Sequence, residues 1–218
     1  MWNNKVCFWV TLAACFRFWQ GYSIAYFALS FFNDYGKNNL YGLLNGLSVM
    51  IGGFSSQLIA GQISDRLEGR YPRTKPYVAM IMSLFGVITC SAVFMVTFSF
   101  YWSITFLFLE YLLAEGWMSP SVAMIQATID VRFKGVAMGI FLFATAIFGT
   151  IGSFVIGQLI QDFHISSQSR KGWLLTINTA VPCLFAALFF YISSIHYEKF
   201  RRTLQSEKEE AQDKASQA

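Results

Sequence analysis

Three ionisable side chains, Arg17, Glu110 and Glu115, lie well inside long apolar stretches of the sequence. In a segment that crosses a lipid bilayer, a charge at the centre costs at least about 2.5–3.5 kcal/mol, so such residues face a protein interior or water. An arginine there could hold an anionic group or pair with a carboxylate. A carboxyl partly removed from water is more easily protonated, so either glutamate could take up a proton. These three residues are therefore candidates for a solute-binding or proton-binding site.

The composition indicates that the stretches around these residues do cross a membrane. Of the 218 residues, 55% are hydrophobic, 18% are aromatic and only 13% are charged, and the mean hydropathy is +0.46. A soluble domain of this size would need far more polar surface to cover its core. We therefore predict a polytopic membrane protein whose first partner is the lipid bilayer. Its small net charge of +4 gives no reason to expect nucleic acid as a partner.

Six apolar runs are long enough to span a bilayer, which needs about 20 residues for a hydrocarbon layer of about 30 Å. Helices are expected throughout, because an open strand would leave backbone groups unpaired in lipid. The fold class predicted is thus an all-α membrane protein with one six-helix domain over residues 1–195. The polar tail at 196–218 is expected to be a solvated helical extension or disordered. The predicted spans are 6–32, 40–64, 77–98, 101–128, 135–161 and 173–195.

The positions of Lys and Arg predict the orientation, because these residues are enriched in cytoplasmic connections. The start of the chain, the second and fourth connections and the beginning of the tail carry most of them, whereas the other connections carry few. Both termini are therefore expected in the cytoplasm, which an even number of spans also requires. The sequence does not indicate which membrane holds the protein. The cytoplasmic cations are Lys5, Arg66, Arg70, Arg73, Lys75, Arg132, Lys134, Lys199, Arg201 and Arg202, and the others Lys37, Arg170 and Lys171.

The two halves of the chain resemble each other, with repeat units at about 1–98 and 99–195. "YGLLNG" opens the second predicted span and "KGVAMG" opens the fifth, and "GGFSSQLIAGQI" later in the second matches "FGTIGSFVIGQL" in the fifth. Three spans per unit is an odd number, so the second unit must lie inverted in the membrane, as in many secondary transporters. Small residues four apart in the fifth span (Gly149, Ser153 and Gly157) predict a close approach of another helix.

Arg17 and Glu115 lie at similar depths in the first and fourth spans, about 17 Å and about 21 Å from the cytoplasmic end. We expect an ion pair between them, either static and fixing helix register or active in binding. Gln20 and Tyr22 could hydrogen-bond a solute, and Trp117 could stack on one, although such residues also commonly serve packing. A helix kink is expected near Pro120, which removes one backbone hydrogen bond.

The charged turn "GQISDRLEGRYPRTKP" after the second span contains a further motif: Gly61, Asp65, Arg66, Gly69 and Arg70. It resembles the loop that joins the second and third helices of a six-helix half in the major facilitator superfamily. The superfamily pattern has one residue between the first Arg and the second Gly, whereas this chain has two. By this resemblance the motif forms a latch on the cytoplasmic side that holds in one state of the transporter and releases in the other. The alternative is that these are ordinary cytoplasmic charges.

The resemblance covers nearly the whole chain but only half of a twelve-span superfamily member. "RYPRTKPYVAM" and "RFKGVAMGIF" look most similar to the C-terminal half of spinster-like members. This implies a secondary transporter, or half of one, that moves a small organic or lipid-like solute by alternating access. Protonation of Glu110 or Glu115, inferred above from their positions, could couple such transport to protons. A second six-helix half, in the same polypeptide or in a dimer, would be its partner. The alternative is a non-transporting structural subunit, or a truncated fragment that pairs with another half.

Nothing in the sequence indicates an enzyme, a cofactor or a metal site. His164 and His196 lie at the ends of predicted spans, and no nucleophile–histidine pair or HExxH pattern occurs at membrane depth. A mitochondrial-type carrier would show a threefold repeat with Pro and acidic residues in each unit, which this chain lacks. The four cysteines stand in apolar runs without ligand spacing, so we interpret them as buried structural thiols. They are Cys7, Cys15, Cys90 and Cys183.

Overall fold

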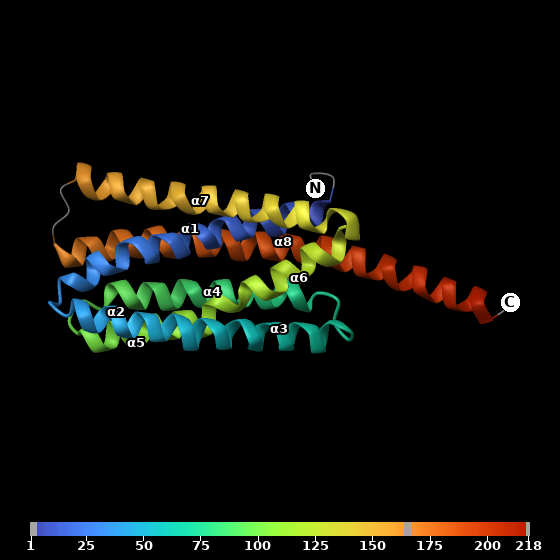
Figure 1. The fold of residues 1–218 in the computed structure, drawn as a ribbon, viewed down its shortest axis with the longest axis horizontal. Coiled ribbons are helices and arrows are strands. Elements are labelled where there is room, and N and C mark those ends of the chain that lie inside the picture. The colour runs from blue at the N-terminus through green and yellow to red at the C-terminus, as the bar shows by residue number, and fades with distance from the viewer. Residues whose placement is uncertain (1–3, 164–166, 217–218) are drawn as a thin grey trace.

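The computed structural model describes residues 4–163 and 167–216, which form a bundle of long helices with short connections (Figure 1). No strand occurs in these two ranges. The helices are α1 (Lys5–Asn33), α2 (Asn38–Leu47), α3 (Phe54–Glu68), α4 (Thr74–Met95), α5 (Phe100–Ala114), α6 (Met118–Thr128), α7 (Lys134–Asp162) and α8 (Gln168–Ser216). A π-helical segment (Ser48–Gly53) joins α2 to α3, and 3₁₀ turns precede α6 (Glu115–Trp117) and α7 (Val131–Phe133).

The helices occupy the six predicted apolar runs, and local chemistry explains several of their ends. Asn4 caps α1, because its side-chain oxygen accepts hydrogen bonds from the backbone N–H groups of Val6 and Cys7 at 3.1 and 3.3 Å. Gly36, in the turn after α1, has a φ of 67°, which favours glycine. At the other end of the chain, α8 continues through the predicted tail, so that tail is a helical extension over its described residues.

The fourth predicted span is divided into α5 and α6 by the 3₁₀ turn at Glu115–Trp117. Pro120 lies in the first turn of α6 and has no N–H to offer the carbonyl of Gly116, four residues earlier. The kink expected near this proline is therefore confirmed.

The helices pack against one another in a small number of extensive pairs. α1 packs against α7 and α8, the α5–α6 segment packs against the π-helical segment, α3 and α4, and α4 packs against α8. Glycines permit the closest approaches: a Cβ on Gly152 of α7 would lie 2.5 Å from the Trp19 ring of α1, and one on Gly52 would lie 3.1 Å from Tyr111 Cβ of α5. The predicted small-residue face on α7 does meet another helix, since Gly149 packs against Tyr22 of α1.

Two apolar clusters form the interior of the bundle. The cluster near the chain termini includes Val10, Met124, Phe141 and Phe190, and the cluster toward the opposite end includes Phe31, Phe94, Ile156 and Leu175. Arg17 and Glu110 lie between the two clusters along α1 and α5. The predicted charged residues therefore occupy the middle of the molecule, at the boundary between its two apolar regions.

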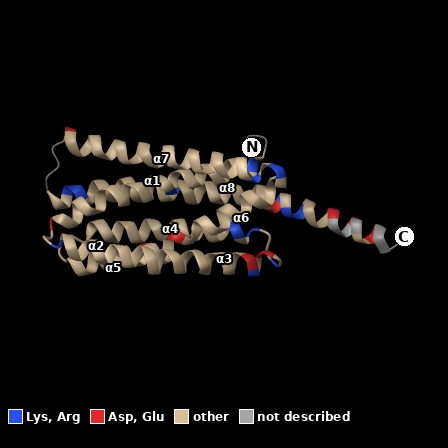
Figure 2. Ribbon diagram, viewed as in Figure 1, with Lys and Arg blue, Asp and Glu red and all other residues tan. Residues whose placement is uncertain are grey.

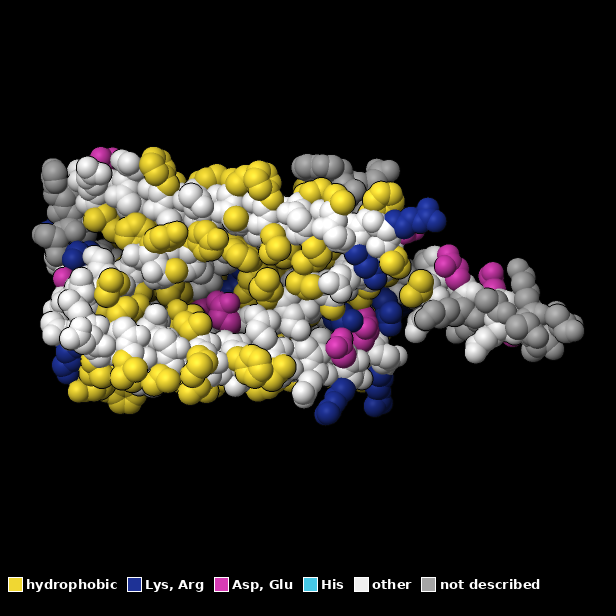
Figure 3. Space-filling view, in the orientation of Figure 1, with side chains coloured by type: hydrophobic (Ala, Val, Ile, Leu, Met, Phe, Trp, Pro, Cys, Tyr) yellow, Lys and Arg dark blue, Asp and Glu magenta, His cyan; other side chains and the backbone are white. Residues whose placement is uncertain are grey.

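Many large apolar side chains are exposed on the outside of the bundle, and the charges gather mainly at its two ends (Figures 2 and 3). Among the described residues, four helical segments are long and apolar enough to cross a membrane: Asn38–Glu68, Thr74–Met95, Val131–Asp162 and Gln168–Glu207. The chain is thus an integral multi-pass membrane protein. The first and fourth predicted spans, which hold Arg17, Glu110 and Glu115, are helical but are not among these four.

Candidate functional site

Arg17 is the centre of a buried polar cluster between α1, α4, α5 and α8. Its side chain is inaccessible to solvent, and its Nη2 lies 3.3 Å from Glu115 Oε1 and 4.0 Å from Glu110 Oε1. The predicted ion pair between Arg17 and Glu115 is therefore confirmed. A Cβ on Gly86 of α4 would lie 2.6 Å from Arg17 Nη1, so the glycine leaves space for the guanidinium.

Arg17 also holds the C-terminal end of α5. Its Nη2 donates a hydrogen bond of 2.8 Å to the carbonyl oxygen of Ala114, the last residue of that helix, and its Nη1 donates one of 3.0 Å to Cys183 Sγ on α8. A cation at a helix C-terminus is favoured because the terminal carbonyls carry partial negative charge. One side chain thus ties α1 to both α5 and α8.

Glu110 lies deeper than Glu115 and is completely buried. Gln20 Nε2 donates a hydrogen bond of 2.9 Å to Glu110 Oε1 and one of 3.4 Å to Cys90 Sγ. The second carboxyl oxygen, Oε2, is buried and has no hydrogen-bond partner among the described residues. By contrast, the Glu115 side chain is 25% exposed, and Figure 3 shows acidic atoms midway along a largely apolar face.

The cluster holds fewer positive than negative groups. Arg17 is the cation within 4.0 Å of both Glu110 and Glu115. If both glutamates were ionised, the cluster would carry a net negative charge in a region of low dielectric constant, which is costly. One proton on either carboxyl would make it neutral. The cluster can therefore bind one proton, and in that protonated state the charge of Arg17 is balanced by the remaining carboxylate.

The two predicted aromatic contacts of the site differ in their surroundings. Trp117 is buried, and the Arg17 guanidinium lies 5.6 Å from its ring centroid, which is a cation–π contact. Tyr22 packs against Gly149 and, edge-on, against Phe18. It makes no polar contact with the cluster within the part of the chain that the structure describes. The structure thus brings together five of the six predicted site residues: Arg17, Gln20, Glu110, Glu115 and Trp117.

Gln57 of α3, which the sequence analysis did not single out, completes the site. Its Nε2 donates a hydrogen bond of 2.7 Å to the Glu115 carbonyl oxygen, and its Oε1 accepts one of 3.0 Å from the Ser119 backbone N–H. In a regular α-helix these two backbone groups would bond each other, because they are four residues apart. The Gln57 amide is therefore inserted into the backbone ladder at the break between α5 and α6.

The predicted motif at the end of α3 contributes one residue, Asp65, to the ion pairs observed there. Lys75 Nζ lies 3.2 Å from Asp65 Oδ1 and 2.7 Å from Glu68 Oε2. Arg66 forms no ion pair with any described residue, and Arg70 stacks on Tyr71 instead. Of the motif glycines, Gly61 faces Ser119 of α6 and Gly69 directly follows α3.

Glu68, which is outside the predicted motif, links this turn to α8. The Tyr197 hydroxyl donates a hydrogen bond to Glu68 Oε1, and Arg201 Nε lies 3.6 Å from the same oxygen. A second link joins Arg73 to Glu198. The ionic contacts at the end of α3 therefore run to α4 and α8 within this bundle, and Asp65 is the motif residue that takes part in them among the described residues.

The cysteines are free and buried, as predicted. Cys7, at the start of α1, lies 3.2 Å from the Thr128 hydroxyl. Cys90 and Cys183 contact Gln20 and Arg17, so they also accept hydrogen bonds in the central cluster.

Comparison with known proteins gives one informative relative. No protein-family model matches the sequence. The chain is 28% identical, over 209 residues, to a protein of Mycolicibacterium smegmatis named an MFS-type efflux pump. The match covers 91% of this chain and 47% of that protein, so the chain spans about half the length of the relative. The similarity supports membership of the major facilitator superfamily at that broad level.

Proposed function

We propose that this chain forms one six-helix half of a secondary active transporter of the major facilitator superfamily. It would move a small organic or lipid-like solute across the membrane by alternating access, with proton coupling through the cluster around Arg17. The relative's name, MFS-type efflux pump, and the coverage of about half of its length support this proposal. The finer assignment to the C-terminal half of a spinster-like member rests on the sequence resemblance.

The pattern of helix packing supports two inverted three-helix repeats. If α1, the α2–α3 span and α4 are one unit, their counterparts are the α5–α6 segment, α7 and α8. The contacts between the two units then occur in matching pairs. α1 packs on α7 as the α5–α6 segment packs on the second span, and α1 packs on α8 as α5–α6 packs on α4. The contact between α4 and α8 is its own counterpart. Such an arrangement is expected for a twofold axis in the membrane plane.

The distribution of charge supports six spans with both termini in the cytoplasm. The two termini of the described chain lie at the same end of the bundle (Figure 1), and Lys and Arg are more frequent there than at the opposite end (Figure 2). This asymmetry agrees with the preference of cytoplasmic connections for basic residues. The first and fourth predicted spans, α1 and the α5–α6 segment, pack against the four apolar helical segments. Their charged residues meet inside the bundle, where Arg17 contacts Glu110 and Glu115.

The observation that carries the proposal is the burial of Arg17 between two glutamates in the middle of the bundle. We propose that the proton binds within this pair of carboxyls, and that a solute reaches the cluster from the side of Glu115, which is partly exposed. Glu110, with one unpartnered and fully buried oxygen, is the favoured proton carrier. Binding or release of a proton would change the electrostatic attraction between Arg17 and the α5–α6 segment. It would thereby change how strongly the two repeats are held together at this point.

Solute-dependent proton flux tests this function. The chain is reconstituted in liposomes that contain a pH-sensitive dye, and amphipathic anions, cations and single-chain lipids are added outside in turn. We expect at least one solute class to move protons, and Glu110→Gln to abolish this flux while Glu207→Gln, an exposed control in α8, retains it. No flux from the native chain with any class would mean that this chain alone does not form a working transporter, which fits either a non-transporting subunit or a half that needs a different second half. Blue-native electrophoresis would then show whether the chain pairs with a second copy.

A charge exchange tests whether the pair acts in binding or only fixes helix register. The double variant Arg17→Glu with Glu115→Arg restores the ion pair with its charges reversed. Normal transport by this variant would exclude a direct role of either residue in solute or proton binding. We expect transport to be lost although the helices remain folded.

A further inference from the structure

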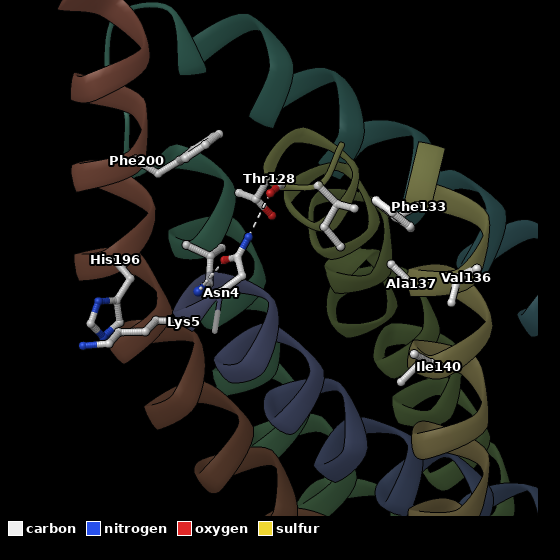
Figure 4. A pocket seen from close by; sticks show the side chains of 11 residues that line it. Asn4, Lys5, Thr128, Phe133, Val136, Ala137, Ile140, His196 and Phe200 are labelled. Carbon is white, nitrogen blue, oxygen red and sulfur yellow. Dashed lines mark hydrogen bonds between the residues drawn. The ribbon is translucent and has the colours of Figure 1, made fainter. Parts of the chain in front are cut away.

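A cavity lies at the proposed cytoplasmic end of the bundle, and none of its lining residues belongs to the central cluster. Its volume is about 680 Å³, and its walls come from the beginning of α1, the end of α6, the beginning of α7 and the middle of α8 (Figure 4). The lining residues used below are Lys5, Phe133, Val136, Ile140 and His196.

The mouth of this cavity carries an excess of positive charge. The side chains of Lys5 and His196 lie side by side in Figure 4, and Lys5 and Lys199 are both close enough to His196 to act on it electrostatically. No carboxylate pairs with Lys5 or His196 among the described residues. Asp130, which lies in the α6–α7 connection, accepts a hydrogen bond of 2.9 Å from the Arg132 backbone N–H through its carboxylate. The site is therefore complementary to an anion.

The opposite wall of the cavity is apolar and continues toward the middle of the membrane. Val136 and Ile140 lie four residues apart at the start of α7, so they share one helix face. Phe133 directly precedes α7, and all three side chains are exposed. The same exposed face continues to Phe143 and Ile147. The cations thus lie at the membrane edge, and an apolar stripe runs from them into the bilayer.

From this geometry we infer that the cavity binds an anionic phospholipid, with its phosphate at Lys5 and His196 and an acyl chain along α7. Lys5 supplies a permanent charge and His196 a hydrogen-bond donor, and basic sites between helices on the cytoplasmic side suit anionic headgroups. A free phosphate ester would use the same cations but would gain nothing from the apolar stripe. The inference needs the cytoplasmic orientation but does not depend on transport.

Native mass spectrometry of the purified full chain in a neutral detergent tests this inference. Three probes are titrated: palmitoyl-oleoyl phosphatidylglycerol, phosphatidylcholine with the same acyl chains, and glycerol 3-phosphate. We expect the phosphatidylglycerol to bind best and Lys5→Gln to weaken it about fivefold, the effect of one cation near an anionic lipid. Val136→Glu places a negative charge in the cavity at an exposed position and should weaken binding at least as much.

Arg66→Gln is the matched control, because it removes an exposed cation from the same end of the bundle but outside the cavity. It should leave binding of phosphatidylglycerol unchanged. Equal losses in Lys5→Gln and Arg66→Gln would mean general surface attraction and would overturn the inference. So would equal binding of the two lipids, or binding of glycerol 3-phosphate with the same dependence on Lys5, which would identify a site for soluble phosphate esters.

Discussion

Replacing Gln57 by methionine would remove the side-chain amide that bridges the break between α5 and α6 and would keep a side chain of similar length. Two hydrogen bonds are lost, to the Glu115 carbonyl and from the Ser119 N–H. At about 1 kcal/mol net for each bond, the free energy of unfolding should fall by about 2 kcal/mol. The loss would be smaller if the two backbone groups moved together and restored a regular helical bond.

Thermal unfolding of the purified chain in neutral detergent measures this loss. For a domain of this length, about 2 kcal/mol corresponds to a decrease in Tm of about 4–8 °C. Gln62→Met is the matched control, because Gln62 is on the same helix but exposed. Hydrogen exchange of the Ser119 amide should also become faster in Gln57→Met. Equal melting temperatures for the two variants, with unchanged exchange at Ser119, would refute the inserted-amide interpretation.

Three further changes probe other parts of the bundle. Gly152→Leu should destabilise the protein by about 1–3 kcal/mol or more, since even a Cβ would collide with the facing tryptophan ring, whereas Gly139→Leu has open space and should be tolerated in the same melting assay. Glu68→Gln should lower the free energy of unfolding by about 1 kcal/mol in low salt and by less in 1 M salt, and Glu207→Gln should have no effect. The four cysteines should not react with maleimide in the folded protein and should all react in SDS, because they are buried; labelling without denaturant would contradict this packing.

The helices and the ion pair between Arg17 and Glu115 could be predicted because both follow from the order of apolar and charged residues along the sequence. A charge in an apolar run is expensive, so it needs a partner at the same depth. The depth follows from the helical rise and the position in the run. The break before Pro120 was predictable for a similar reason, since the missing N–H is a property of the residue itself.

Gln57 and Glu68 were not predictable in this way. A single neutral amide in an apolar run carries little cost, and the role of Gln57 depends on which helix packs beside the break in α5–α6. Glu68 is the last residue of α3 and stands beside several other charges. Its contacts with Lys75 and Tyr197 depend on how α4 and α8 pack beside that helix end. Partners so far apart in sequence are decided by tertiary packing, which hydropathy and motif spacing do not describe.

The uninterrupted course of α8 has a mechanical consequence. About 20 of its residues extend beyond the apolar part, which corresponds to about 30 Å of helix. Such a rod acts as a lever: if its base in the membrane tilts by about 10°, its tip sweeps about 5 Å, from the length given by the helical rise. A spectroscopic label on the outer end would therefore magnify rearrangements in the bundle that are too small to follow at their origin.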